Sequence, residues 1–130
     1  MGSEQDAKRV LIVEEDERMR SVIRGIAQEE GYITEFVDND LDALKRLAWQ
    51  PFDLIIIDGR TLGSIRYHTI AGLKKLQPDA FVCFITDIGV RSVRPEPFGR
   101  EGTLFFKWPI DVRRLRKVLQ EFMSQEHEHG

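Results

Sequence analysis

The chain has 130 residues, of which 42% are hydrophobic and 32% charged, a composition typical of one globular domain with a buried core. Its 19 basic and 22 acidic residues give a net charge of −3, so no basic excess exists to neutralise the phosphates of a nucleic acid. No apolar run resembles a signal peptide or reaches the length of a membrane-spanning helix. Composition therefore argues against nucleic acid or a membrane as a direct partner.

The single cysteine, Cys83, lies inside an apolar run and cannot form an internal disulfide. A chain without disulfides suits a reducing compartment, so we expect a cytoplasmic protein. The predicted domain spans residues 9–124, between flexible segments at 1–8 and 125–130. It is either a stand-alone protein or one domain of a larger one.

Short apolar runs alternate with helical patterns along the chain. The predicted strands cover residues 9–13, 32–37, 54–57, 80–85 and 103–106. The predicted helices cover residues 17–30, 39–49, 65–76 and 111–123. Between residues 88 and 102, Pro95 and Pro97 allow at most a short helix. Strands alternating with helices predict an α/β, doubly wound fold, in which a five-stranded parallel sheet has helices on both faces.

Local signals mark the ends and the buried faces of these helices. Gly31 is placed to end the first helix, and either Asp38 or Asn39 is placed to cap the second. Apolar residues at helical spacing predict the side that packs on the sheet. Among the residues expected to face inward are Val22, Leu41, Ala48, Leu76 and Val112.

Asp58 is the first candidate for a functional residue. It follows directly on four apolar residues, 54–57, and precedes Gly59. A carboxylate does not remain deep in an apolar core without a partner, so Asp58 is expected where the strand leaves the sheet. Ligands bind at the carboxyl ends of strands in open α/β sheets. The alternative is an aspartate that only begins a turn.

Other polar residues follow the remaining strands. Glu14 and Glu15 come after the first strand, Thr86 after the fourth, and Lys107 at the end of the fifth. Clustered carboxylates attract Mg²⁺, which prefers oxygen ligands, and a carboxylate can itself accept a phosphoryl group. A hydroxyl and an ammonium would stabilise the transferring oxygens. Alternatively, Glu14-Glu15-Asp16 is only a solvated acidic turn at a helix start, and Thr86 only caps a helix.

Four stretches of the chain resemble the receiver domains of two-component response regulators. They are Val10-Leu-Ile-Val-Glu-Glu-Asp-Glu-Arg18, Phe52-Asp-Leu-Ile-Ile-Ile-Asp58, Phe81-Val-Cys-Phe-Ile-Thr86 and Phe105-Phe-Lys-Trp-Pro-Ile-Asp111. The resemblance implies a flavodoxin-like fold of the CheY type. It also implies a signalling domain in a phosphorelay rather than an enzyme, with a histidine kinase or a phosphotransfer protein as its partner.

The same resemblance assigns roles to single residues. Asp58 becomes the phosphoacceptor, and Glu14, Glu15, Asp58 and the backbone carbonyl of Arg60 become ligands of Mg²⁺. The hydroxyl of Thr86 follows the phosphoryl group.

Three further implications of the resemblance concern the end of the sheet and its partners. Phe105 becomes the aromatic switch of the fifth strand, and Lys107 is the candidate for the lysine that assists phosphoryl transfer. The family often forms homodimers through the face of the fourth helix, fifth strand and final helix. The output partner is not implied.

The chain also departs from the family pattern. The second acid of the pair is usually aspartate, and Glu15 carries an additional methylene, to which Mg²⁺ is sensitive. The loop Gly59-Arg-Thr-Leu-Gly-Ser64 is shortened. The segment Arg94-Pro-Glu-Pro-Phe-Gly99 disrupts the fourth helix. These changes weaken the predicted cation site and the partner-binding helix.

The lysine of the family stands directly before a proline, but here Trp108 precedes Pro109. In one alignment Trp108 takes the position of the lysine, and Lys107 points away because strand side chains alternate. In the other, a bulge returns Lys107 to the site. The family also predicts a cis peptide bond before Pro109.

Two functions remain open from the sequence. One is a receiver phosphorylated on Asp58, and the other is a pseudo-receiver that binds proteins without phosphorylation. A flavin-binding domain of similar topology fits poorly, because acids follow the first strand where a phosphate loop is needed.

Overall fold

The computed structural model describes residues 7–59, 66–86 and 102–124, with the backbone alone for residues 66–70. These residues form one sheet and four helices in the order β1 (Arg9–Val13), α2 (Glu17–Glu29), β2 (Ile33–Val37), α3 (Asp40–Leu47), β3 (Leu54–Asp58), α4 (Arg66–Leu76), β4 (Phe81–Thr86), β5 (Thr103–Lys107) and α5 (Val112–Ser124). The boundaries lie within about two residues of the prediction, which is the usual uncertainty of helix ends. The segment from 94 to 99 and the predicted flexible segments at 1–8 and 125–130 lie outside the described residues, except for residues 7 and 8.

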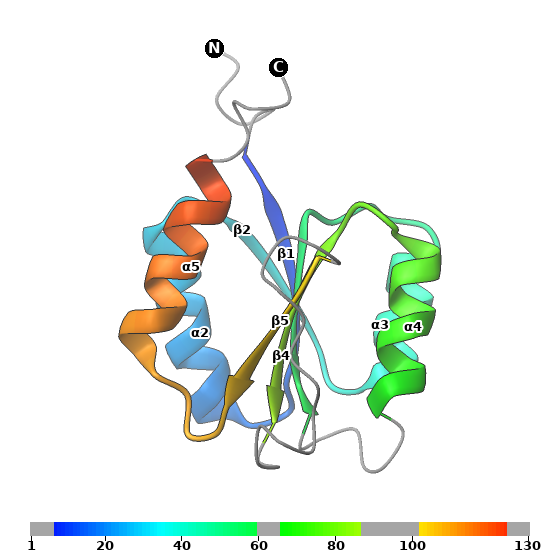
Figure 1. The fold of residues 1–130 in the computed structure, drawn as a ribbon, viewed down its shortest axis with the longest axis horizontal. Coiled ribbons are helices and arrows are strands. Elements are labelled where there is room, and N and C mark those ends of the chain that lie inside the picture. The colour runs from blue at the N-terminus through cyan, green and yellow to red at the C-terminus, as the bar shows by residue number, and fades with distance from the viewer. Residues whose placement is uncertain (1–6, 60–65, 87–101, 125–130) are drawn as a thin grey trace.

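The five strands are all parallel and stand in the order β2-β1-β3-β4-β5. Helices α2 and α5 cover one face of the sheet, and α3 and α4 cover the other (Figure 1). This arrangement confirms the predicted doubly wound, flavodoxin-like fold. Because every strand runs the same way, all the carboxyl ends lie at one edge of the sheet.

The strands contribute alternate residues to two apolar clusters, one on each face of the sheet. In β3, Leu54 and Ile56 pack with α2 and α5, whereas Ile55 and Ile57 pack toward α3 and α4. All four side chains are fully buried. The run of apolar residues therefore marks a central strand that is covered on both faces, as the sequence predicted.

Some residues expected to face inward are exposed instead. They are Val22, Leu41, Ala48, Leu76 and Val112. In α3 the buried positions are Ala43 and Leu47, four residues apart. The helix surface that packs on the sheet is narrower than the apolar side predicted from the sequence. Apolar residues at the margins of that side therefore remain exposed to solvent.

Local hydrogen bonds explain where the helices begin and end. The side chain of Asn39 accepts a hydrogen bond of 2.9 Å from the amide of Asp42, which decides the choice between Asp38 and Asn39 as the cap of α3. Gly31 follows α2 with a φ of 93°, a conformation that glycine adopts without strain. The structure thus confirms that Gly31 follows the end of α2 and that one of the two predicted residues, Asn39, caps the start of α3.

Gln77 joins the end of α4 to the segment that precedes β3. Its side-chain oxygen accepts from the amide of Phe52 at 2.8 Å, and its nitrogen donates to the carbonyl oxygens of Leu47 at 2.9 Å and Gln50 at 2.5 Å. We expect Gln77→Leu to lower the free energy of unfolding by about 2 kcal/mol, because partly buried backbone groups lose their partners. Chemical denaturation measures this.

The control is Gln120→Leu, which removes a single exposed hydrogen bond to Glu30. It should change stability by less than about 0.5 kcal/mol. Equal losses in the two variants would contradict a structural role for Gln77.

Cys83 lies at the centre of β4 and is completely buried. Burial raises the pKa of its thiol to about 12, since the thiolate loses its hydration. Such a thiol is unreactive, and it acts as a core residue. In the described part of the chain, no helix is both long enough and apolar enough to span a membrane.

Candidate functional site at the carboxyl edge of the sheet

Asp58 ends β3 with its residue only 1% exposed. Val13 and Ile57 are partners in the register of β1 and β3, so Glu14 follows β1 at the level where Asp58 ends β3. Glu14 is likewise 1% exposed. The structure therefore brings two buried carboxylates together on neighbouring strands, as the sequence predicted for this edge. Asp58 is thus a buried carboxylate, and whether it does more than begin a turn stays a prediction.

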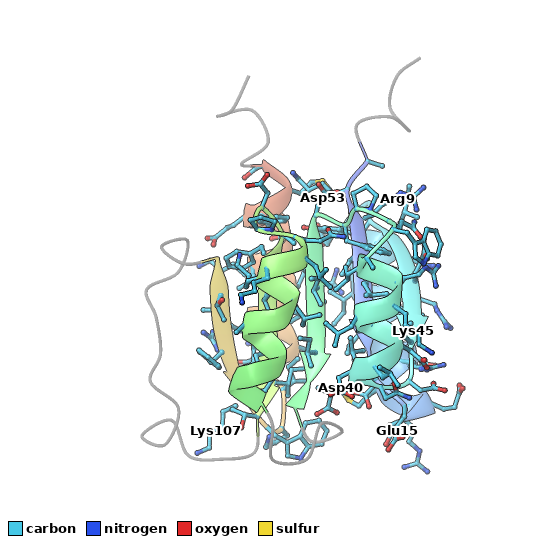
Figure 2. All side chains as sticks on the ribbon, turned by 90° about the vertical axis from the view of Figure 1, so that its right-hand side faces the viewer. Arg9, Glu15, Asp40, Lys45, Asp53 and Lys107 are labelled. Carbon is cyan, nitrogen blue, oxygen red and sulfur yellow. The ribbon has the colours of Figure 1, made fainter. Side chains whose placement is uncertain are left out.

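The two glutamates that follow β1 have different environments. A side-chain oxygen of Glu14 accepts a hydrogen bond of 3.0 Å from the amide of Asp16, and its own amide donates to Val37. Glu15 is exposed at the carboxyl edge, opposite the end marked by Arg9 and Asp53 (Figure 2). Asp16, the third acid, caps α2 by accepting from the amide of Arg18 at 2.8 Å. Only part of this acidic turn is therefore a solvated helix start.

Arg20 supports the acidic turn, and the sequence analysis did not identify it. Its Nε donates a hydrogen bond of 2.5 Å to the backbone carbonyl of Glu14, and another guanidinium nitrogen pairs with Asp38. The guanidinium also lies 5.4 Å from the ring centre of Phe36. Arg20 thus ties α2 to the ends of β1 and β2. The only local feature that could have indicated this role is the position of Arg20, one helical turn after the cap residue Asp16.

Thr86 ends β4 and is 2% exposed. Its Cα pairs with Lys107 in the register of β4 and β5. The amide of Trp108 donates a hydrogen bond of 2.7 Å to the carbonyl of Thr86, so the pairing continues one residue beyond β5. The peptide bond between Trp108 and Pro109 is cis, as predicted.

The alternation of side chains separates Lys107 from Asp58. Asp58 follows Ile56, which packs toward α2 and α5, and Trp108 packs against the same cluster. Lys107 is in phase with Phe105, which packs toward α3 and α4, and it is exposed. Lys107 and Glu15 mark well-separated places along the carboxyl edge (Figure 2). Trp108 therefore shares the face of Asp58, whereas Lys107 shares the face of Thr86.

Phe105 lies in the edge strand β5 and is partly buried. Its ring meets that of Phe84 edge to face, with ring centres 5.7 Å apart and planes at 78°, an arrangement that aromatic pairs favour. Phe105 is therefore held by the Phe84 ring and is only partly buried among the described residues.

The donor chemistry fits a magnesium ion in part. Mg²⁺ is usually held by one or two carboxylates together with water, and Glu14 and Asp58 supply two adjacent carboxylates. Among the described residues, however, no three His, Cys, Asp or Glu side chains come close enough to form a metal site. Arg60, whose carbonyl was a predicted ligand, lies outside the described residues. If the ion binds, Glu14 and Asp58 would hold it, with Glu15 at the outer side.

The sequence profile of the response regulator receiver domain matches residues 10–120. The chain belongs to this family. It is a receiver domain of two-component signalling, as the resemblance implied. Receiver domains receive their signal from a kinase or a phosphotransfer protein, and they typically bind Mg²⁺.

Individual relatives of this receiver domain are distant. It is 23% identical over 116 residues to the response regulator receiver protein CpdR of Brucella abortus, covering 89% of this chain and 97% of the relative. A CheY-like receiver domain from Methanospirillum hungatei has a TM-score of 0.75 at 21% identity, with 95% and 99% of the two chains covered.

A third relative is the receiver domain of the sensor histidine kinase PA1611 from Pseudomonas aeruginosa. Its TM-score is 0.70 at 19% identity, over 91% of this chain and 98% of that one. That structure holds a magnesium ion in its active-site cleft. At these identities the structural likenesses establish the fold of the receiver domain, and its chemistry has to be argued from its own residues.

Proposed function

We propose that this receiver domain accepts a phosphoryl group on Asp58 from the phosphohistidine of a kinase or phosphotransfer protein. The observation that supports this most directly is the pair of buried carboxylates, Asp58 and Glu14, at the carboxyl edge of the sheet. A carboxylate oxygen of Asp58 forms the new bond to phosphorus while the bond from phosphorus to the imidazole nitrogen breaks. The electron pair of that bond returns to the imidazole.

Residues near Asp58 are proposed to bind the metal ion, to stabilise the phosphoryl group and to respond to phosphorylation. Glu14, Glu15 and the carbonyl of Arg60 are proposed to hold Mg²⁺ together with Asp58 itself, and the ion would neutralise charge on the transferring oxygens. Thr86 ends the adjacent strand in phase with Lys107, and its short side chain is proposed to donate its hydroxyl hydrogen bond to the phosphoryl group beyond the end of the sheet. Phosphorylation adds roughly −1.5 to −2 of charge, and Phe105 is proposed to respond to that change.

The position of the family lysine is proposed to belong to Trp108. The support is that Trp108 packs against the apolar cluster on the face of Asp58, whereas the side chain of Lys107 is exposed to solvent. On this reading the ammonium that normally faces the transferring oxygens is absent from that position. Phosphoryl transfer should then be slow, and Lys107 would contribute little to it.

Acetyl phosphate, with and without Mg²⁺, tests this function through the intact mass of the protein. The expected result is a gain of one phosphoryl group that depends on Mg²⁺ and disappears in Asp58→Asn. Glu15→Gln serves as a graded control, because the loss of this carboxylate should raise the Mg²⁺ concentration needed for the mass gain while leaving the acceptor in place. A mass gain that persists in Asp58→Asn would refute the proposed acceptor.

The second candidate is a pseudo-receiver that binds its partner without phosphorylation. Trp108 on the face of Asp58 and the exposed Glu15 are the observations that favour it. This function predicts no mass gain under any condition. It also predicts a partner that binds the native protein and Asp58→Asn with equal affinity.

A further inference from the structure

The backbone after Asp58 lies tightly against the next strand. A β-carbon added to Gly59 would lie 2.6 Å from the carbonyl oxygen of Ile85 and 2.7 Å from Cζ of the Phe84 ring. Non-bonded carbon atoms normally approach to roughly 3.5–4.0 Å. Residue 59 therefore has to be glycine, and the Phe84 ring occupies the space that its side chain would need.

Phe84 is 1% exposed, so its ring is enclosed in the cluster under α3 and α4. One part of the ring faces Gly59, and the ring also meets Phe105 edge to face. Close-packed interiors transmit displacements because they contain few voids into which a side chain can move. A shift of the backbone at Gly59 therefore displaces the Phe84 ring, and with it Phe105.

We propose that Phe84 is a positioning residue that couples the backbone next to Asp58 to the ring of Phe105. The contact runs from β3 through β4 to β5 and bypasses Thr86. The coupling is a property of the packing, and its use in signalling rests on the proposed function. Packing contacts act in both directions, so a change at Phe105 is expected to reach Gly59 through the same ring.

The amide resonance of Gly59 in the ¹⁵N-labelled full chain tests the coupling without any phosphorylation. Four proteins are compared: the native chain, Phe105→Leu, Phe84→Leu and the double variant. We expect Phe105→Leu to move the Gly59 resonance in the native background. The same change should move it by less than about half as much when residue 84 is leucine, as coupled sites are non-additive.

Phe81→Leu is the matched control background. Phe81 is another buried phenylalanine of β4, but it packs on the opposite face, with its ring centre 5.3 Å from that of Phe122. In this background Phe105→Leu should retain its full effect on Gly59. Circular dichroism checks that each variant is folded, and Phe84→Met replaces Phe84→Leu if the latter is not.

Equal movement of the Gly59 resonance with and without Phe84 would overturn the proposal, and so would no movement in the native background. Neither result depends on whether Asp58 accepts phosphate. If acetyl phosphate gave no mass gain, the proposed function would be refuted. The coupling through Phe84 would still be tested by the Gly59 resonance.

Discussion

Trp108→Lys should accelerate the phosphorylation of Asp58 by acetyl phosphate by about tenfold or more, equivalent to ~1.4 kcal/mol of transition-state stabilisation. The substitution places an ammonium on the face of the sheet that carries Asp58. There it would act on charge that develops on the transferring oxygens. The initial rate of the mass gain at fixed Mg²⁺ measures the effect.

Lys107→Met is the matched control for this prediction. Lys107 is exposed and in phase with Phe105, so its loss should change the rate by less than about twofold. A marked slowing in Lys107→Met, with no gain in Trp108→Lys, would mean that Lys107 reaches the phosphoryl group after all. The alignment that places Trp108 in the lysine position would then be wrong.

Leu54→Ala should lower the free energy of unfolding by about 2–5 kcal/mol, because it leaves a cavity in a close-packed interior. Leu54 is 0% exposed in the central strand β3. The same substitution at Leu41, which is 58% exposed on α3, should cost less than about 0.5 kcal/mol. Denaturant unfolding of both variants measures the difference.

This pair of leucines also decides between two readings of α3. The apolar pattern of the sequence placed Leu41 inward, and the structure leaves it in solvent. A loss at Leu41 comparable with that at Leu54 would mean that Leu41 is covered in solution. It would contradict the narrow contact between α3 and the sheet.

The fold could be predicted from the sequence because its signals are local. A continuous apolar run such as 54–57, rich in β-branched residues, indicates a strand covered on both faces, and helices between strands indicate parallel crossovers. The same topology carries Asp58, Glu14 and Thr86 to one edge. The prediction of these three residues needed only the rule that parallel strands end together.

The finer features of the site depend on contacts between distant segments. The sequence does not show which of Glu14 and Glu15 is buried. Their burial depends on which way each side chain points where the backbone leaves the end of β1. Arg20 and Phe84 were missed for a related reason. Arg20 acts through the ends of two strands, and Phe84 acts through Gly59 of the preceding strand. No periodicity within one element reveals such partners.

The proposed acceptor is tested most directly by locating the modification. After reaction with acetyl phosphate and Mg²⁺, borohydride reduces an aspartyl phosphate to homoserine, and peptide mass spectrometry then identifies the residue. The account predicts one reduced residue, at position 58, which is absent without Mg²⁺. Reduction at Glu14, Glu15 or another carboxylate, or no reduced residue in the folded protein, would contradict it.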